Sequence, residues 1–337
     1  MNLDERISAF TKLGSRINEL PDGEIKDLTE RAGNLNPWFT PENIKLAIAE
    51  IEKLLTREAL TQWTAQYHLE QPMPRTVGVA MAGNIPLVGF HDYLSILISG
   101  HRIQIKPSTQ DSVLLPYLNN ILLDIEPRFH PSISFVDRLS GYDMAIATGS
   151  NNTARYFNYY FKNVPHLIRK NRSSCAILLG EESEKETHRL GSDVFTYFGL
   201  GCRNVSKLYV PEEYDFIPLL RSWERYLPVI DHHKYANNYT YQRTIHLMNQ
   251  KHFYDNGTII LIEDERLVSP IATVYYEKYS DQDDLKMRLA MHEDKIQCIA
   301  SANGWFKGSC DFGKTQQPAL WDYADCVDTL KFLSADQ

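Results

Sequence analysis

Cys202 is the residue in this sequence best placed for covalent chemistry. It lies in the segment Phe-Gly-Leu-Gly-Cys-Arg-Asn-Val-Ser-Lys-Leu-Tyr-Val-Pro (198–211), between a predicted helix and a predicted strand. Glycines at 199 and 201 allow the backbone to approach a ligand closely, and a cysteine thiolate is a strong nucleophile. The pattern predicts a reactive cysteine in a loop. The competing interpretation is a small buried thiol without a chemical role.

The region before this loop alternates between short apolar runs and helical segments. Predicted strands cover 76–82, 102–105, 133–136, 144–147 and 174–179. Repeated strand–helix–strand units form a parallel sheet with helices on both faces, and ligands bind at the carboxyl ends of its strands. The sequence lacks the G-x-G-x-x-G pattern, so a dinucleotide site cannot be inferred from that motif.

Four regions follow from these patterns. A helical segment covers 1–72, where Thr40 is a predicted N-cap followed by Pro41. A domain with a parallel sheet is expected at 73–180, and a mixed α/β domain carrying Cys202 at 181–305. The last segment, 306–337, is rich in polar and aromatic residues and is expected to complete the active site or to contact another subunit of a homo-oligomer.

Composition narrows the possible partners and location. The 337 residues are 43% apolar, which is enough for a large core in two domains. A net charge of −8 argues against a nucleic-acid partner. The five cysteines form no CxxC pair, and no signal peptide or membrane span is evident, so we expect a cytoplasmic protein. The histidines around Asp231-His232-His233 are expected to be solvated, and no metal site is predicted.

An ordered set of motifs resembles the aldehyde dehydrogenase superfamily. The set comprises Met-Ala-Gly-Asn-Ile-Pro (81–86), Ile-Gln-Ile-Lys-Pro-Ser (103–108), Thr-Gly-Ser (148–150) and the cysteine segment itself. Val-Ser-Pro (268–270) is a weaker match to the superfamily's Phe-Gly-Pro. Within the superfamily, the run after Cys202 and the tail Phe-Gly-Lys-Thr-Gln…Trp-Asp-Tyr-Ala-Asp (312–325) are most similar to the LuxC-type fatty acyl-CoA reductases, although the chain is shorter than the luminescence members.

The resemblance implies an α/β fold in which the domain at 73–180 is a Rossmann-like NAD(P)-binding domain and the domain at 181–305 is the α/β catalytic domain. It also implies that Cys202 is the nucleophile and that the Asn84 amide, with the Cys202 backbone N–H, stabilises the oxyanion. The competing interpretation of Asn84 is an N-cap for the helix that follows Pro86. Phe312 and Gly313 are expected to line the active site, as the matching tail does in the family.

The resemblance further implies a nicotinamide cofactor. Lys106 would bind the adenosine ribose with Ser108 and Thr109 beside it, and Gly149 and Ser150 would hold the pyrophosphate at a helix N-terminus. Because Thr109 is uncharged, where relatives that prefer NAD often have a glutamate, NADPH is the expected cofactor and NADH is possible. Arg266 stands where the superfamily has a ribose-binding glutamate, which is a departure from the pattern.

The sequence lacks an acidic residue that hydrolysis of an acyl-enzyme would require, and this favours exchange with a thioester. Hydrolytic aldehyde dehydrogenases activate water with a glutamate at the position that falls near Ile168, but there is no Asp or Glu between Asp143 and Glu181. Loss of such a base costs roughly 10²–10⁴-fold in rate, whereas a thiol such as coenzyme A needs less activation. The basic residues Arg169, Lys170 and Arg172 are expected to form a solvated turn.

The predicted activity is NADPH-dependent reduction of a long-chain acyl-CoA to the aldehyde through a thioester on Cys202, which makes the protein an oxidoreductase. Coenzyme A would enter as part of the substrate, and a partner enzyme could deliver the acyl group. Three alternatives stay open: a reductase of an acyl phosphate or a short acyl-CoA, a thiol acyltransferase or thioesterase without a hydride step, and a non-catalytic binding subunit.

Overall fold

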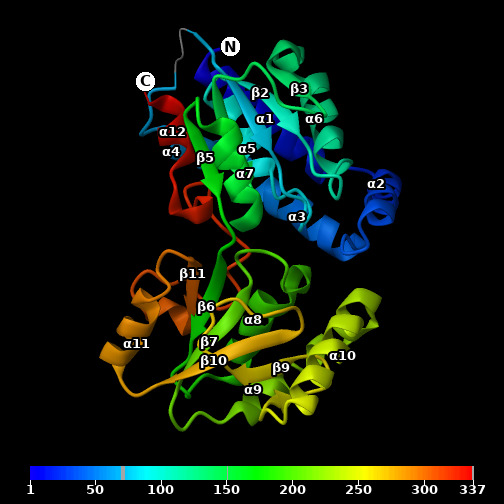
Figure 1. The fold of residues 1–337 in the computed structure, drawn as a ribbon. Coiled ribbons are helices and arrows are strands. Elements are labelled where there is room, and N and C mark those ends of the chain that lie inside the picture. Colours follow the sequence, from blue (N-terminus) through cyan, green and yellow to red (C-terminus); the bar gives the residue numbers. More distant parts are fainter. Residues whose placement is uncertain (70–72, 150, 336–337) are drawn as a thin grey trace. The chain divides into compact units, whose positions relative to one another are not determined.

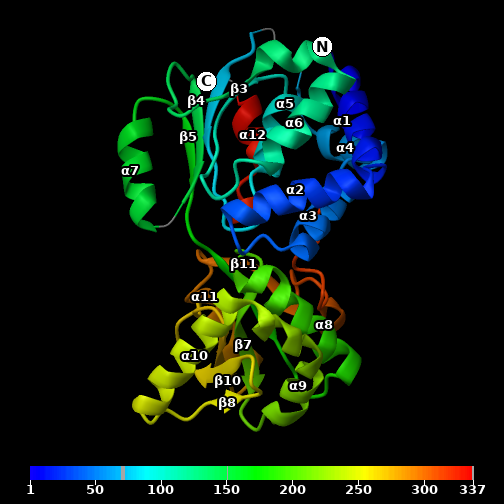
Figure 2. The same ribbon diagram turned by 90° about the vertical axis from the view of Figure 1, so that its right-hand side faces the viewer.

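The computed structural model describes residues 1–69, 73–149 and 151–335, and its chain divides into two compact units (Figures 1 and 2). The first unit comprises residues 1–171 and 319–337, and the second comprises residues 172–318. Each unit is built around its own sheet. The predicted α/β class, with parallel sheets and a helical N-terminus, is confirmed.

The first unit contains a five-stranded, fully parallel sheet with the order β3-β2-β1-β4-β5. Its strands are β1 (Thr76–Ala80), β2 (Arg102–Lys106), β3 (Ile133–Phe135), β4 (Met144–Thr148) and β5 (His166–Arg169). Most residues of the central strands β1 and β4 are buried. Strands covered on both faces need such continuous apolar runs, which is why the sequence marked them clearly.

Helices cover this sheet, and the first four come from the N-terminal segment. They are α1 (Leu3–Asn18), α2 (Asp22–Leu35), α3 (Pro41–Leu54), α4 (Arg57–Thr64), α5 (Phe90–Ile98), α6 (Leu114–Ile125), α7 (Asn151–Phe161) and α12 (Thr329–Ser334), with the 3₁₀ turns η1 (Pro127–Ser132) and η5 (Ala324–Cys326). Thr40 caps α3 through its side chain, as predicted. Figure 2 shows α7 on one side of the sheet and α5 and α6 on the other.

The second unit contains a six-stranded sheet with the order β11-β6-β7-β10-β9-β8, parallel except for the antiparallel pair β8–β9. Its strands are β6 (Ser173–Ile177), β7 (Val205–Pro211), β8 (Tyr254–Asp255), β9 (Ile260–Glu263), β10 (Thr273–Tyr279) and β11 (Ile296–Ser301). Its helices are α8 (Glu184–Phe195), α9 (Phe216–Ser222), α10 (His233–Met248) and α11 (Gln282–Ala290), with the 3₁₀ turns η2 (Thr196–Gly199), η3 (Glu224–Asp231) and η4 (Ala302–Gly304).

Several boundaries differ from those expected. The units divide after Asn171, so β6 belongs to the second unit, whereas the sequence grouped 174–179 with the cofactor half. The last segment is split, because residues up to Pro318 belong to the second unit and those from Ala319 to the first. No helix in the described part of the chain is long and apolar enough to cross a membrane.

Candidate active site

Cys202 lies in the second unit, on the turn between η2 and the start of β7. The residue is partly buried, and its carbonyl oxygen accepts a hydrogen bond of 3.0 Å from the Ser174 hydroxyl of β6. The structure therefore places the thiol at a helix-to-strand junction, held from the adjacent strand. Loops fixed on a rigid scaffold in this way commonly carry catalytic residues.

The chain before Cys202 has an uncommon backbone shape. Tyr197, Phe198 and Gly199 have φ values of 53°, 59° and 76°, all in the left-handed region. Glycine adopts this region freely, but each of the two aromatic residues stores about 1–3 kcal/mol of strain there. Packing holds them in place, since the Phe198 ring lies 4.3 Å from the His232 ring and Tyr197 is buried. Strained backbone of this kind collects at functional sites.

Asn204 binds the two sides of the Cys202 loop together, a role that the sequence did not reveal. Its side-chain oxygen accepts from the Gly201 N–H at 2.8 Å, and its amide donates to the carbonyls of Asp193 at 3.0 Å and Thr196 at 2.8 Å. The residue is only 2% exposed. Because an amide side chain both accepts and donates, it satisfies groups from the end of α8 and from the loop at the same time.

Asp193, near the end of α8, binds the tail segment that resembles the family. Its carboxylate accepts from the Gly313 N–H at 2.6 Å, the Thr315 N–H at 3.0 Å and the Thr315 hydroxyl at 2.8 Å. Burial raises the pKa of Asp193 to about 6. Phe312 is fully buried in the core, so its side chain does not line an open site as expected.

Two further thiols lie close to the Cys202 loop. The Cys298 sulfur is 3.0 Å from the Ser174 hydroxyl, the same hydroxyl that bonds to Cys202. A hydrogen bond with the Cys310 thiol lowers the pKa of Cys298. Cys298 is therefore more than a core side chain, and any labelling experiment on Cys202 needs it as a control.

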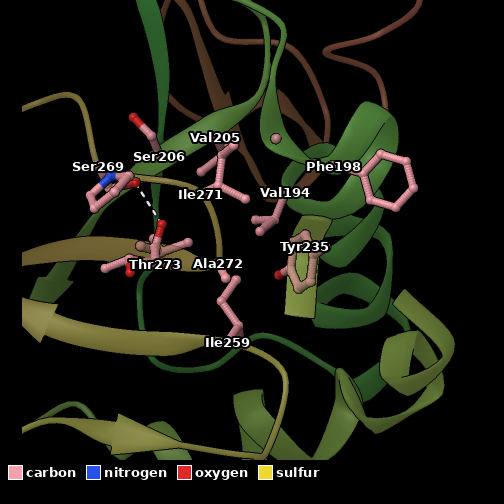
Figure 3. Close-up of a pocket in the computed structure, with 13 residues that line it drawn as sticks. Val194, Phe198, Val205, Ser206, Tyr235, Ile259, Ser269, Ile271, Ala272 and Thr273 are labelled. Atoms are coloured by element: carbon pink, nitrogen blue, oxygen red, sulfur yellow. Dashed lines mark hydrogen bonds between the residues drawn. The ribbon is translucent and has the colours of Figure 1, made fainter. Parts of the chain in front are cut away.

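A mainly apolar hollow lies within the second unit, beside the segment that precedes Cys202 (Figure 3). The enclosed space is only about 20 Å³, and the volume reaches about 310 Å³ when the open mouth is counted. Val194, Phe198, Tyr235, Ile259 and Ile271 are among its lining side chains. The segment 269–274 forms one wall, so the Ser-Pro pair that weakly matches the family motif borders the same hollow.

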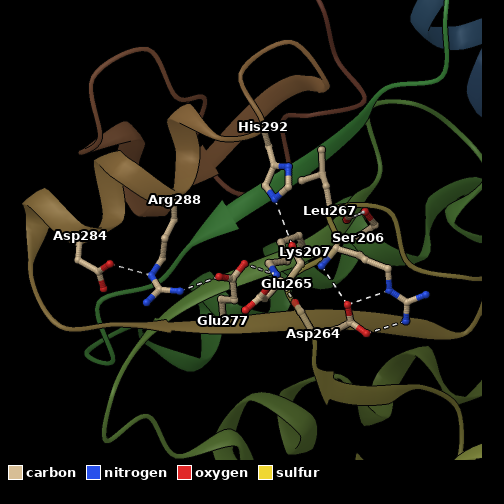
Figure 4. Close-up of polar contacts among 10 residues, drawn as sticks. Ser206, Lys207, Asp264, Glu265, Leu267, Glu277, Asp284, Arg288 and His292 are labelled. Atoms are coloured by element: carbon tan, nitrogen blue, oxygen red, sulfur yellow. Dashed lines mark hydrogen bonds and ion pairs between the residues drawn. The ribbon is translucent and has the colours of Figure 1, made fainter.

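The strand after Cys202 also holds the loop 264–267 (Figure 4). Lys207, which is fully buried, bonds to the Asp264 carbonyl and lies 2.5 Å from a Glu277 carboxylate oxygen. Ser206 donates to the Leu267 carbonyl at 2.8 Å. Burial lowers the pKa of Lys207. A paired, enclosed charge of this kind serves to fix geometry, because it is out of reach of a substrate.

Arg266 lies on that loop with its side chain largely exposed. Its guanidinium group is 2.6 Å from an Asp264 carboxylate oxygen and 4.9 Å from the centre of the Tyr275 ring. Arg266, the residue predicted to stand in place of the family's ribose-binding glutamate, is thus a cation that contacts an acid and an aromatic face.

The residues predicted to bind the cofactor lie in the first unit, where β1, β2 and β4 end. Ala80 pairs with Lys106 on one side and with Ala147 on the other, so the segments carrying Asn84, Lys106 and Gly149 leave the same edge of the sheet. A Cβ on Gly83 would lie 2.6 Å from the Ser108 hydroxyl, which shows how closely the first two loops approach. Lys106, Thr109 and Asn84 are exposed, and Ser108 is half-buried.

Asn84 does not cap the following helix, because α5 begins at Phe90 with Gly89 at its N-cap. The competing interpretation of Asn84 is therefore wrong. Ser150 lies outside the described residues. Gly149 donates its N–H to the Arg169 carbonyl at 3.2 Å.

Asp111 is a further positioning residue of this edge that the sequence did not reveal. Its carboxylate accepts from the Leu87 N–H at 2.9 Å and so joins the loop after β1 to the loop after β2. Leu87 has φ of 58°, a strained value that this bond helps to hold. Burial raises the pKa of Asp111 to about 6.

The predicted solvated turn at Arg169 is wrong. Arg169 is 5% exposed, ends β5, and its guanidinium lies 2.5 Å from an Asp92 carboxylate oxygen and 2.8 Å from the Thr329 hydroxyl. Lys170, in contrast, is exposed. Ile168, near which the family's catalytic glutamate is predicted to fall, pairs with Ala147 and lies on β5 of the first unit.

The edge where β1, β2 and β4 end carries the kinds of group that bind a nucleotide. These groups are the exposed ammonium group of Lys106 and the hydroxyls of Ser108 and Thr109. Gly83 and Gly149 leave the backbone accessible there, because a Cβ on Gly149 would lie 3.1 Å from Thr153. Helix α7 begins directly after Thr148–Ser150, and free N–H groups at a helix start favour phosphate. Among the described residues, no group of three or more His, Cys, Asp or Glu side chains is arranged to hold a metal ion.

These two units together have the fold of the aldehyde dehydrogenases. Structures that share it include aldehyde dehydrogenase 21 from Physcomitrella patens in complex with succinate, with a TM-score of 0.64 and 13% identity over 89% of this chain and 73% of the other. A Mycobacterium tuberculosis aldehyde dehydrogenase complexed with NAD+ matches with a TM-score of 0.63 and 12% identity over 94% and 76%. No family model and no curated protein matches the sequence.

Proposed function

We propose that this protein is a covalent acyl-thioester reductase that converts a long-chain acyl-CoA to an aldehyde with NADPH. The observation that carries the proposal is Cys202 on a strained, hydrogen-bonded loop at the end of α8, within the aldehyde dehydrogenase fold. The LuxC-like motifs around this loop and in the tail support the narrower choice of substrate.

In the proposed reaction the Cys202 thiolate attacks the carbonyl carbon of the acyl-CoA, and the carbon–sulfur bond to coenzyme A breaks. Coenzyme A leaves as a thiolate and takes up a proton, and the acyl group remains on Cys202 as a thioester. The Cys202 N–H and the Asn84 amide are the proposed donors to the oxyanion, and one such donor is commonly worth about 2.7–4 kcal/mol.

The absence of an acidic residue between Asp143 and Glu181 supports reduction over hydrolysis. Without a carboxylate base, attack by water on the Cys202 thioester is slow. The acyl group therefore persists until it is reduced or returned to coenzyme A.

Lys106, Ser108, Thr109, Gly149 and Ser150 are the proposed nucleotide-binding residues. Lys106 and the two hydroxyls would hold the adenosine ribose, and the segment 149–150 would hold the pyrophosphate. The bound nicotinamide would supply the reducing equivalent for the acyl group. The uncharged Thr109 beside Lys106 supports NADPH, with NADH as the alternative, because Thr109 itself carries no negative charge that would repel a 2′-phosphate.

Most side chains that line the hollow beside Phe198 are apolar, which suits an apolar acyl group, but its enclosed space of about 20 Å³ must widen before it holds a long chain. Delivery of the acyl group by a partner enzyme, assembly into a homo-oligomer and a cytoplasmic location complete the proposal. These three points rest on the sequence.

The deciding experiment measures acyl-CoA-dependent oxidation of NADPH with a series of chain lengths, in the wild type and in Cys202→Ala. Cys298→Ala is the matched control, because that thiol is the neighbour of the same serine. We expect activity in the wild type and in the control, and none in Cys202→Ala. Acyl loading of Cys202 without nicotinamide consumption would instead establish an acyltransferase, and no loading would refute both.

A further inference from the structure

A continuous set of hydrogen bonds joins the Cys202 loop to the tail segment 313–315, and Asp193 is the residue that connects them. Asn204 accepts from the Gly201 N–H and donates to the main-chain carbonyl of Asp193. The side chain of the same Asp193 accepts three bonds from Gly313 and Thr315. The main-chain carbonyl of Asp193 thus binds one segment and its carboxylate binds another, and these two segments are more than a hundred positions apart in the sequence.

We propose that Asp193 is a positioning residue that couples the order of the tail segment 313–315 to the order of the Cys202 loop. The consequence for catalysis rests on the proposed function, but the coupling itself is independent of any substrate. Nothing in the sequence motifs assigns a role to Asp193, which lies near the end of α8 and outside the cysteine segment.

Burial and donor geometry support this role. Asp193 is 1% exposed, and both of its carboxylate oxygens accept from the tail, so neither can bond to water instead. Hydrogen bonds to a carboxylate are about twice as strong as bonds between neutral groups. Thr315 is 1% exposed as well, and it donates through both its N–H and its hydroxyl. The contact between Asp193 and Thr315 is therefore buried from water, and its donors and acceptors are matched.

The tail is shaped to reach this carboxylate. Gly313 has φ of 81°, and a Cβ at this position would lie 3.2 Å from the Cβ of Arg189 on α8. A glycine is required both for the backbone conformation and for the close approach. Asp311, two residues earlier, forms an ion pair with Arg189 and accepts from the Asn303 N–H at 2.7 Å. The segment is thus fastened to α8 at two successive points.

The test is hydrogen exchange of individual amides in the full chain without substrate. In Asp193→Asn the side chain keeps one oxygen, but its NH₂ group faces a donor, so at least one bond is lost. We expect the amides of Gly313 and Thr315 to exchange about tenfold faster or more, and the Gly201 amide to accelerate with them. Acceleration of the tail amides with the Gly201 amide within about twofold of wild type would overturn the coupling.

A second pair of variants keeps the test valid if Asp193→Asn does not fold. Thr315→Val removes only the hydroxyl donor, whereas Thr315→Ser retains it, so we expect faster exchange at Gly201 in the first and wild-type exchange in the second. Thr187→Val is the matched control, since Thr187 is a buried residue of α8 whose hydroxyl bonds only within the helix. Equal effects of Thr187→Val and Thr315→Val on Gly201 would show general destabilisation and overturn the proposal.

The positioning role is measured at the thiol itself. We expect the rate of iodoacetamide alkylation of Cys202, followed on its own peptide by mass spectrometry, to change several-fold in Asp193→Asn and Thr315→Val and to be restored in Thr315→Ser. An unchanged rate in both variants would refute positioning. Failure of the proposed function would be seen differently, as an absence of acyl-CoA turnover in the wild type, and it would leave the exchange and alkylation results intact.

Discussion

Replacing Asn204 with alanine removes the side chain that closes the Cys202 loop. The substitution deletes the acceptor for the Gly201 N–H and the donors to the carbonyls of Asp193 and Thr196, at 2.8, 3.0 and 2.8 Å. At a net value of about 0.5–1.5 kcal/mol for each of the three bonds, the loss amounts to about 1.5–4.5 kcal/mol. The upper part of this range is expected, because these partners would be left buried without a bond.

Thermal unfolding followed by circular dichroism measures this loss. For a unit of this size, 1 kcal/mol corresponds to roughly 2–4 °C in melting temperature, so we expect a decrease of about 3–18 °C. Asn238→Ala is the control, because Asn238 also donates to a main-chain carbonyl, that of Lys234, but in an exposed position of α10. A change below about 0.5 kcal/mol in Asn204→Ala, equal to that of the control, would refute the closing role of this side chain.

Three further predictions follow from buried groups. Arg169→Met leaves Asp92 as an unpaired buried charge, so we expect the free energy of unfolding to decrease by about 3–5 kcal/mol. The double variant Arg169→Met/Asp92→Leu should recover most of this loss, and an additive loss in the double variant would contradict the prediction. Burial raises the pKa of Asp193 from 3.8 to about 6, so the folded state binds this proton more tightly than the unfolded state does. The free energy of unfolding should therefore fall by up to about 3 kcal/mol as the pH rises from about 4 to 6, and stay constant above that. In urea titrations across this range, Asp193→Asn should lack that decrease. Ile271→Phe fills part of the hollow and should shift the chain-length preference of acyl-CoA turnover toward shorter chains; an unchanged profile would exclude the hollow as the acyl site.

The elements that sequence reasoning placed well are those whose signal is local. Central strands such as β1 and β4 appear as continuous apolar runs, and the junction at Cys202 is marked by glycines and a proline. Thr40 and Pro41 show the start of α3 in the same way. Such signals depend only on the residues within one element, so a single sequence contains them.

The errors arose where partners are distant in sequence. Arg169 has the appearance of a solvated cation until its partner Asp92, 77 positions away, is known. Asp111 and Asp193 are ordinary acids in their local context, and their acceptor roles appear only when the loop at Leu87 and the tail at Gly313 are brought to them. β5 was missed because four residues between Pro165 and Lys170 carry too little apolar periodicity to indicate a strand.

The strand β7 explains why the Cys202 loop can be both strained and fixed. Just before it Asn204 binds the end of α8, and its own residues Ser206 and Lys207 bind the loop 264–267. Three nearly consecutive side chains therefore tie the loop that presents the thiol to two other segments of the same unit. A nucleophile on a turn that is held in this way loses little entropy when it attacks, because its position is set during folding. The left-handed φ values at Tyr197 and Phe198 cost roughly 1–3 kcal/mol each, and the stabilisation from these bonds offsets part of that cost.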